Sequence, residues 1–194
     1  MRGFPPRARF LVGTAVAAVL AAGCGTDVPA GFTAAAAESG ASRVSLTYPE
    51  KWSKVPAGQR APHATFAARR ATGSGTVAKV AVLTGLGQAG DAGLAVAMAM
   101  AGPQVGWRDY DKEREEAIEV PGAHDAARVD YTYSAVRPGG SGAATHPAAG
   151  TDVVLVGDDR RVTVVRVTWR RGGKGAVTEG TVSSIVASVR VKND

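Results

Sequence analysis

Alternating hydrophobic and polar positions predict β-strands along most of this chain. In residues 43–48, Val44, Leu46 and Tyr48 fall on one side of an extended segment, as in a strand with one buried face. The same pattern predicts further strands over residues 63–70, 76–84, 113–120, 126–137 and both arms of a hairpin at 151–169. For residues 113–120 the dense charges also suit a helix, although the alternation before Pro121 favours a strand.

Two of these strands carry additional information about their surroundings. Residues 126–137 alternate cleanly, and the apolar side consists of Ala127, Val129, Tyr131, Tyr133 and Ala135. Residues 162–169 are apolar on both sides, as expected of a strand in the middle of a sheet that is covered on both faces. The hairpin that contains them is predicted to turn at residues 157–159.

Helical spacing occurs twice. After Asp91, a suitable N-cap, Leu94, Ala97, Met98 and Ala101 share one predicted buried face, with Met98 in the core. Gly102 and Pro103 are expected to end this helix. A second helix is predicted over residues 178–189, capped by Thr178 or Thr181, with a buried stripe of Val182, Ile185, Val186 and Val189.

The order of these elements predicts the fold class. Strands come in runs joined by short turns, with one helix in the middle and one near the end, rather than in strict strand–helix alternation. This order indicates an α+β domain built on a mainly antiparallel sheet. The Gly- and Pro-rich residues 138–150 are expected to form a mobile loop.

The first residues resemble an export signal. Arg2, Arg7 and Arg9 precede an uncharged, mostly apolar run over residues 10–22, which is shorter than the ~20 residues of a membrane-spanning helix. The run ends in Leu-Ala-Ala-Gly-Cys24, which resembles a bacterial lipobox. The resemblance implies that Cys24, the one cysteine of the chain, is acylated and becomes the first residue of the mature protein.

Three regions are therefore expected: a lipoprotein signal peptide at 1–23, a lipidated Cys24 with a flexible tether at 24–42, and one globular domain at 43–194. Acyl chains on one cysteine are sufficient for stable anchoring. We expect the protein to be anchored by lipid to the extracytoplasmic face of the cell membrane. With its cysteine acylated, the domain has no disulfide.

The net charge of the chain adds little to the prediction of its function. The formal net charge is +6, but three of the 23 Lys and Arg residues lie in the signal segment. No block of five like charges occurs and no basic stripe is interleaved with aromatics, so we expect no nucleic-acid partner.

The motifs that suggest chemistry are weak. Gly85-x-Gly87-x-x-Gly90 has the spacing of a dinucleotide fingerprint, but the residues after it do not predict the second parallel strand that such a site needs. We expect a strand-to-helix turn there, no cofactor, no metal site and no catalytic set. His124 beside Asp125 is the remaining candidate for hydrolytic chemistry.

Three aromatic residues are candidates for a ligand or partner surface. Trp52, Trp107 and Tyr110 lie in turn-rich or polar segments, where they either line a groove or form the edge of the core. Trp169 is expected in the core.

Parts of the chain resemble PsbP-like domains, in particular actinobacterial LpqN-type lipoproteins. The resemblance is carried by YPEKW at residues 48–52, by VPGAHDAARVDYTY at 120–133, and by the final hairpin and helix. It implies an α/β/α sandwich around an antiparallel sheet and carries over no catalytic residues, so an enzyme is not expected.

Two functions follow as expectations. The favoured one is a non-catalytic binding or scaffold module for an envelope protein. The alternative is a carrier or chaperone for an envelope lipid or glycolipid.

Overall fold

The computed structural model describes residues 28–73, 75–136, 145–172 and 176–193. The signal segment and Cys24 lie outside these ranges. The elements, in chain order, are β1 (Phe32–Ser39), β2 (Ser42–Pro49), β3 (Ser53–Lys54), a 3-10 turn (Ala57–Gln59), β4 (Ala64–Thr72), β5 (Gly75–Leu83), α1 (Ala92–Gly106), β6 (Arg108–Ala117), β7 (Asp125–Val136), β8 (Thr145–Val156), β9 (Val162–Arg170), α2 (Glu179–Ala187) and β10 (Arg190–Asn193).

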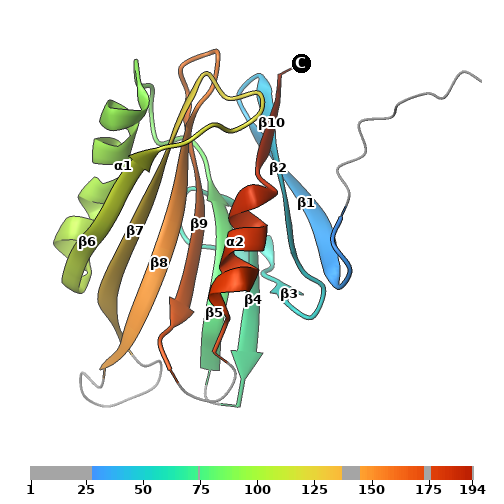
Figure 1. Ribbon diagram of the computed structural model, residues 1–194, viewed down its shortest axis with the longest axis vertical. Helices are drawn as coiled ribbons and strands as arrows, with labels where there is room; N and C mark the ends of the chain where they lie inside the picture. The colour runs from blue at the N-terminus through green and yellow to red at the C-terminus, as the bar shows by residue number, and fades with distance from the viewer. Residues whose placement is uncertain (1–27, 74, 137–144, 173–175, 194) are drawn as a thin grey trace, which may run out of the picture.

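A seven-stranded sheet forms the centre of the molecule, in the order β3-β4-β5-β9-β8-β7-β6 (Figure 1). Every strand pair in the described ranges is antiparallel. The predicted α+β class with a mainly antiparallel sheet is therefore confirmed. The strand predicted to be central, now β9, lies between β5 and β8.

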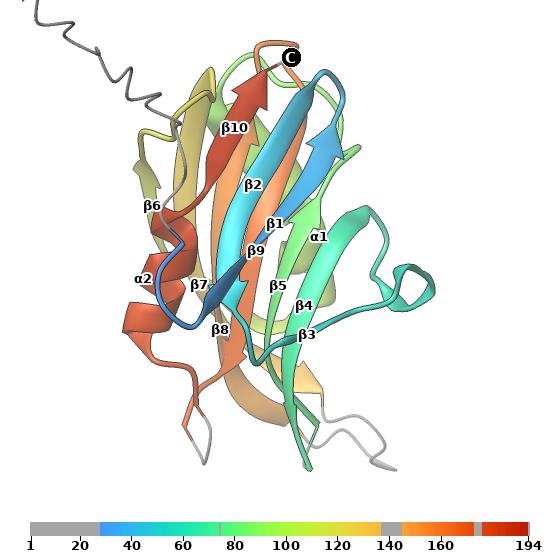
Figure 2. The ribbon, with the colours of Figure 1, turned by 90° about the vertical axis from the view of Figure 1, so that its right-hand side faces the viewer.

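One face of the large sheet is covered by α2 and by a small sheet of order β1-β2-β10 (Figure 2). Between them lies a core with contributions from both sheets and from α2, including Leu46, Val80, Leu155, Val165 and Ile185. The side chains predicted to share a face in β2, including Val44 and Tyr48, are buried in this core.

The other face is covered by α1, which packs on β6, β7 and β8. Val129, Val154 and Val164 meet Ala95 and Met100 of the helix there. The layers thus follow the expected sandwich, except that one outer layer combines α2 with a three-stranded sheet.

The predicted flexible tether was wrong over its second half. Residues 32–39 form β1, which pairs with β2 in an unbroken register from Phe32–Pro49 to Ser39–Ser42. The segment FTAAAAES shows no strong alternation because its side chains are small. Its strand conformation is stabilised by the backbone ladder to β2 and by burial of Ala37.

The predicted buried face of α1 was also wrong. Leu94 is 51% exposed, whereas the buried residues of this helix are Ala92, Ala95, Val96, Ala99, Met100 and Pro103. Met100, not Met98, is the core methionine. The helix is apolar almost all round, so the sequence contained little information on its rotation. It also continues through Pro103 to Gly106 rather than ending at Gly102.

Two further boundaries differ from the expectation. β8 begins at Thr145, so the second half of the predicted loop at 138–150 is strand; residues 137–144 lie outside the described ranges. The charged segment forms β6 from Arg108 to Ala117, which confirms a strand rather than a helix but places it five residues earlier. The second helix begins as predicted, with Thr178 accepting a hydrogen bond from the Thr181 amide.

Candidate functional site

Two of the three predicted surface aromatics meet in one cluster. Trp107 caps the end of α1 and stacks on Tyr133 of β7, with ring centroids 4.4 Å apart. Tyr110 of β6 lies 6.4 Å from Trp107 and 5.6 Å from Tyr131. The four rings pack between the end of α1 and the large sheet, and Tyr131 is 1% exposed.

A charged pair lies beside these rings. Asp152 of β8 and Arg166 of β9 are direct cross-strand partners. The Arg166 guanidinium donates hydrogen bonds to the Asp152 carboxylate from Nε, at 2.9 and 3.0 Å, and from Nη2, at 2.6 Å. The Tyr131 hydroxyl donates to Asp152 Oδ1 at 2.8 Å, and the Arg166 guanidinium lies 5.1 Å from the centre of the Trp107 ring.

The ionisation of this group of residues follows from burial and mutual charge. Burial acts to lower the pKa of Arg166, but the Asp152 carboxylate outweighs it and the pKa is raised. Burial, reinforced by Asp152, raises the pKa of Tyr131 well above its usual value. The carboxylate is thus fully occupied by donors, so this part of the structure orders the sheet and presents no free acid or base.

Trp52 lies elsewhere and is only 5% exposed, in the core between the two sheets. Its edge lines a hollow of about 400 Å³ together with Glu50, Lys51, Arg70 and Thr178. The structure therefore does not bring Trp52 together with Trp107 and Tyr110. Trp52 is thus a buried residue at the edge of the core that also borders this hollow, and its contact with a ligand or partner stays a prediction.

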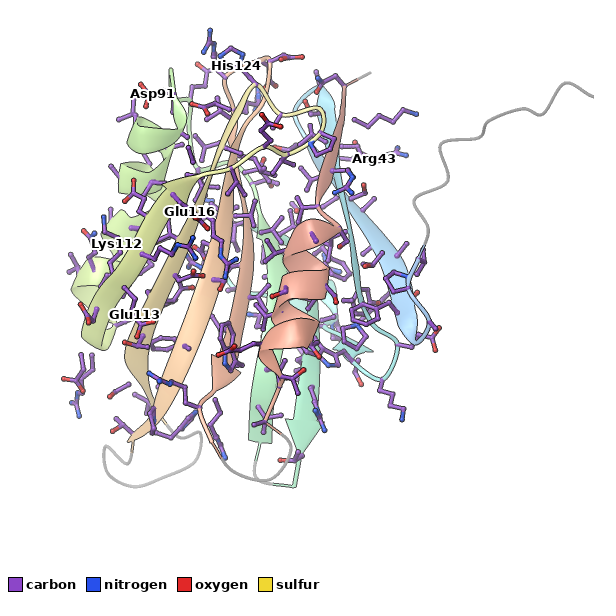
Figure 3. All side chains as sticks on the ribbon, viewed as in Figure 1. Arg43, Asp91, Lys112, Glu113, Glu116 and His124 are labelled. Atoms are coloured by element: carbon purple, nitrogen blue, oxygen red, sulfur yellow. The ribbon has the colours of Figure 1, made fainter. Side chains whose placement is uncertain are left out.

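His124 and Asp125 have separate hydrogen-bond partners. His124 Nε2 lies 2.8 Å from an Arg160 guanidinium nitrogen at one end of the molecule (Figure 3). Asp125 accepts hydrogen bonds from the amides of Ala92, at 2.8 Å, and Ala126. Its carboxylate is used to hold the N-terminus of α1.

The glycine spacing at 85–90 is a strand-to-helix turn, as expected. Gly87 has φ of +116°, and a side chain there would collide with the end of Met98. The Asp91 side chain accepts a hydrogen bond from Leu94 N at 2.8 Å, so a carboxylate occupies the helix N-terminus where a dinucleotide phosphate would need to bind.

The outer edge of β1 is a second candidate site. The Thr47 amide of β2 points away from β1, because it donates to Ser188 Oγ at 2.8 Å. Thr47 pairs with Ala34, so Ala34 and, two residues on, Ala36 direct their own backbone groups outward. No backbone hydrogen bond joins either residue to another part of the described chain beyond β2. Both residues are exposed.

The other sheet edges in the described ranges are protected. Strand β6 carries charged residues at most positions and two register irregularities, and Lys112, Glu113 and Glu116 lie along it (Figure 3). Strand β3 has two residues. The Val191 amide of β10 donates to Pro121 O at 2.9 Å. Charges, bulges and short length are devices that prevent strand pairing, and β1 has none of them along Ala34–Ala36.

The sequence contained a signal for the Asp152–Arg166 pair that the pattern analysis missed. Asp152 is the one acidic residue of β8, and Arg166 lies between valines in β9. Each has the same parity as a buried valine of its strand, Val154 or Val164. Two opposite charges at matching positions of a hairpin predict a cross-strand pair. The β1 edge gave no such signal, since small residues fit both a linker and a strand.

Two kinds of feature are absent among the described residues. These residues include no group of three or more His, Cys, Asp or Glu side chains placed to hold a metal ion. No helix in the described ranges is long and apolar enough to cross a membrane.

Comparison with known proteins finds similarity at the level of structure. No protein-family profile matches the chain, and no curated protein matches it by sequence. The structure is similar to the solution structure of cyanobacterial PsbP (CyanoP) from Synechocystis sp. PCC 6803, with a TM-score of 0.49 and 14% identity. The match covers 88% of this chain and 98% of that one. It concerns the fold alone.

Proposed function

We propose that this protein is a non-catalytic binding module, held at the extracytoplasmic face of a membrane by acylated Cys24, of the kind represented by LpqN-type lipoproteins. In this proposal β1 recruits an envelope protein by pairing with an extended segment of it. The observation that carries the proposal is the uncharged outer edge of β1, where Ala34 and Ala36 are exposed and have no backbone hydrogen bond to another described element beyond β2.

The chemistry of this edge suits strand addition. Backbone amides and carbonyls supply hydrogen bonds to any extended peptide, while the side chains that flank them set specificity. The small side chains of β1 allow a partner strand to approach without steric conflict. Glu38, which is exposed and bonded to Arg43 at 2.7 Å, adds a charge at one end of the edge.

The rest of the described structure supports a role without catalysis. Asp125 binds a helix N-terminus, Asp152 is saturated by Arg166 and Tyr131, and His124 lies against Arg160. The lipid-carrier alternative has weaker support. The hollow beside Trp52 has an apolar part at Pro49 and Val177, but Glu50, Lys51 and Arg70 also line it, and these charged residues suit an acyl chain poorly.

A single substitution tests the role of the edge. Proline at position 36 removes an amide that points outward, so it leaves the β1–β2 ladder intact. Ala36→Pro is therefore expected to retain the fold and to lose the partner. Ala35→Pro is the matched control for the ladder, because the amide of Ala35 belongs to the β2 side and its loss should destabilise the domain.

Partner capture is measured by photo-crosslinking in intact cells. A photoreactive residue at position 36 is expected to give a reproducible crosslink to another envelope protein, and the same residue at Val105, which is 91% exposed on α1, should not. A crosslink pattern identical at both positions, or crosslinks only to a second copy of this chain, would contradict the proposal.

A further inference from the structure

Four positive side chains share the face of the large sheet that bears α1. Arg69 of β4 and Lys79 of β5 are direct cross-strand partners, and Lys79 pairs in turn with Thr168 of β9. Arg166 and Arg170 flank Thr168 two residues away on the same side of β9. We refer to Arg69, Lys79, Arg166 and Arg170 as the cationic row.

The row lies beyond the cover of α1. The helix contacts β6, β7 and β8, and Arg166 marks its border by donating to Ala99 O at 3.4 Å. Arg69 is exposed, Lys79 and Arg170 are half-buried, and the Arg166 side chain is 16% exposed. The row is therefore accessible from solvent. The exposure of its side chains increases from Arg166 on β9, near the middle of the sheet, to Arg69 on β4.

Three of the four positive charges have no ion-pair partner within the described part of the chain. Arg69, Lys79 and Arg170 form no ion pair there. Arg166 is paired with Asp152, which also accepts a hydrogen bond from Tyr131. The buried Nε atom of Arg170 has no hydrogen-bond partner. Like charges directly opposite each other on two strands are destabilising, so the Arg69–Lys79 pair costs stability.

The electrostatic environment of Lys79 is consistent with this arrangement. Its pKa is lowered, first by burial and then by the charges of Arg166 and Arg69. Carboxylates are not among the groups that act on it. A bound anion would reverse the charge effect, because it would supply the missing counter-charge.

Hydroxyl groups adjoin the cations. Thr168 lies in the row between Arg166 and Arg170, and it is hydrogen-bonded to the Tyr133 hydroxyl. Ala81 and Ala148, the cross-strand neighbours of Arg166 and Arg170, have small side chains. Guanidinium groups pair with two oxygens at once, whereas an ammonium acts as a point charge, and both are typical of phosphate sites.

We propose that the cationic row is a binding site for a phosphoryl group, with Lys79 as its central ligand and Arg69, Arg166 and Arg170 as flanking charges. The phosphoryl group belongs either to free phosphate or to the head group of an anionic phospholipid. The site is on the opposite face of the large sheet from β1, so it is independent of the edge proposed to bind protein.

The test uses the full-length mature lipoprotein in a non-ionic detergent, titrated with inorganic phosphate at constant ionic strength set with chloride. The wild type is expected to show a saturable rise in melting temperature with phosphate. Lys79→Met should weaken phosphate binding about tenfold or more, a change of about 1.4 kcal/mol. Without phosphate, the same variant should melt at a higher temperature than the wild type, because the Arg69–Lys79 repulsion is gone.

Lys192→Gln is the matched control, since Lys192 is an exposed cation on β10. It should bind phosphate as the wild type does. A chain that shows no phosphate-dependent rise over chloride, or a Lys79→Met variant that binds phosphate unchanged, would overturn the proposal. Arg170→Gln, a change at a half-buried position of another strand, gives an independent second variant and should also weaken binding.

The source of the phosphoryl group is decided by a second titration, with detergent micelles containing phosphatidylglycerol or, as a control, phosphatidylcholine. Tighter binding to phosphatidylglycerol micelles than to inorganic phosphate, lost in Lys79→Met, assigns the site to a lipid head group. Binding of inorganic phosphate with no preference for phosphatidylglycerol assigns it to free phosphate. Failure to bind either probe overturns the site.

Discussion

The ring of Tyr131 on β7 occupies the space that a side chain at Gly150, its cross-strand partner on β8, would need. A Cβ at position 150 would overlap the ring and its hydroxyl. The glycine therefore lets the tyrosine lie close to the sheet, where its hydroxyl reaches Asp152 at 2.8 Å.

Gly150→Ala is accordingly expected to destabilise the protein by about 1–3 kcal/mol, because the ring must move and strain the contact with Asp152. Gly102→Ala is the matched control. Gly102 is on the exposed side of α1 with open space around it, so alanine should stabilise by ~0.5–1 kcal/mol. Denaturant unfolding measures both, and equal effects of the two substitutions would contradict the packing described.

Breaking the Asp152–Arg166 pair is expected to destabilise the protein more than Gly150→Ala does. Asp152→Asn leaves a guanidinium with a side chain 16% exposed and without its carboxylate, which typically costs about 3–5 kcal/mol. Glu38→Gln, which breaks the exposed pair with Arg43, should cost about 0–1 kcal/mol. Thermal or denaturant unfolding compares them, and a loss below that of Glu38→Gln would show that the buried pair contributes nothing net.

The rotation of α1 is tested by truncating one residue on each side of it. Met100 is 1% exposed and Leu94 is 51% exposed. Met100→Ala is expected to destabilise by about 2–5 kcal/mol and Leu94→Ala by much less, since only the first leaves a cavity. A larger loss of stability from Leu94→Ala than from Met100→Ala would contradict this rotation and support the buried face that the sequence pattern predicted.

The pKa values of all four tyrosines of the chain are raised in the folded state, in each case first of all by burial. Each hydroxyl holds its proton more tightly in the folded protein than in the unfolded chain. Their contribution to stability is therefore complete below a pH of about 10, the ordinary tyrosine pKa, and is lost as the pH rises above it.

Alkaline titration followed by tyrosinate absorbance should show little ionisation of the native protein at the pH where the urea-unfolded chain is half ionised. Tyr131→Phe removes the most strongly shifted group and should flatten the loss of stability at high pH. A native titration curve that coincides with the unfolded one would contradict the burial of these hydroxyls.

The sequence by itself determined the strands with strong alternation, the central position of β9, and the cap at Thr178, because each depends on local spacing or composition. The α+β class followed from the order of elements. The signal segment and the lipid anchor at Cys24 are predictions from the sequence that lie outside the described structure.

Tertiary structure decided what the local pattern left undefined. The small residues of β1 and α1 differ little in hydrophobicity between the two faces of each element. Pairing with β2 therefore sets the conformation of β1, and packing on β6–β8 sets the rotation of α1. The proximity of Trp107 to Tyr133, of Asp152 to Arg166 and of Arg69 to Lys79 depends on strand register. Register joins residues far apart in the chain, and the energy that fixes it comes from the assembled sheet rather than from any one segment.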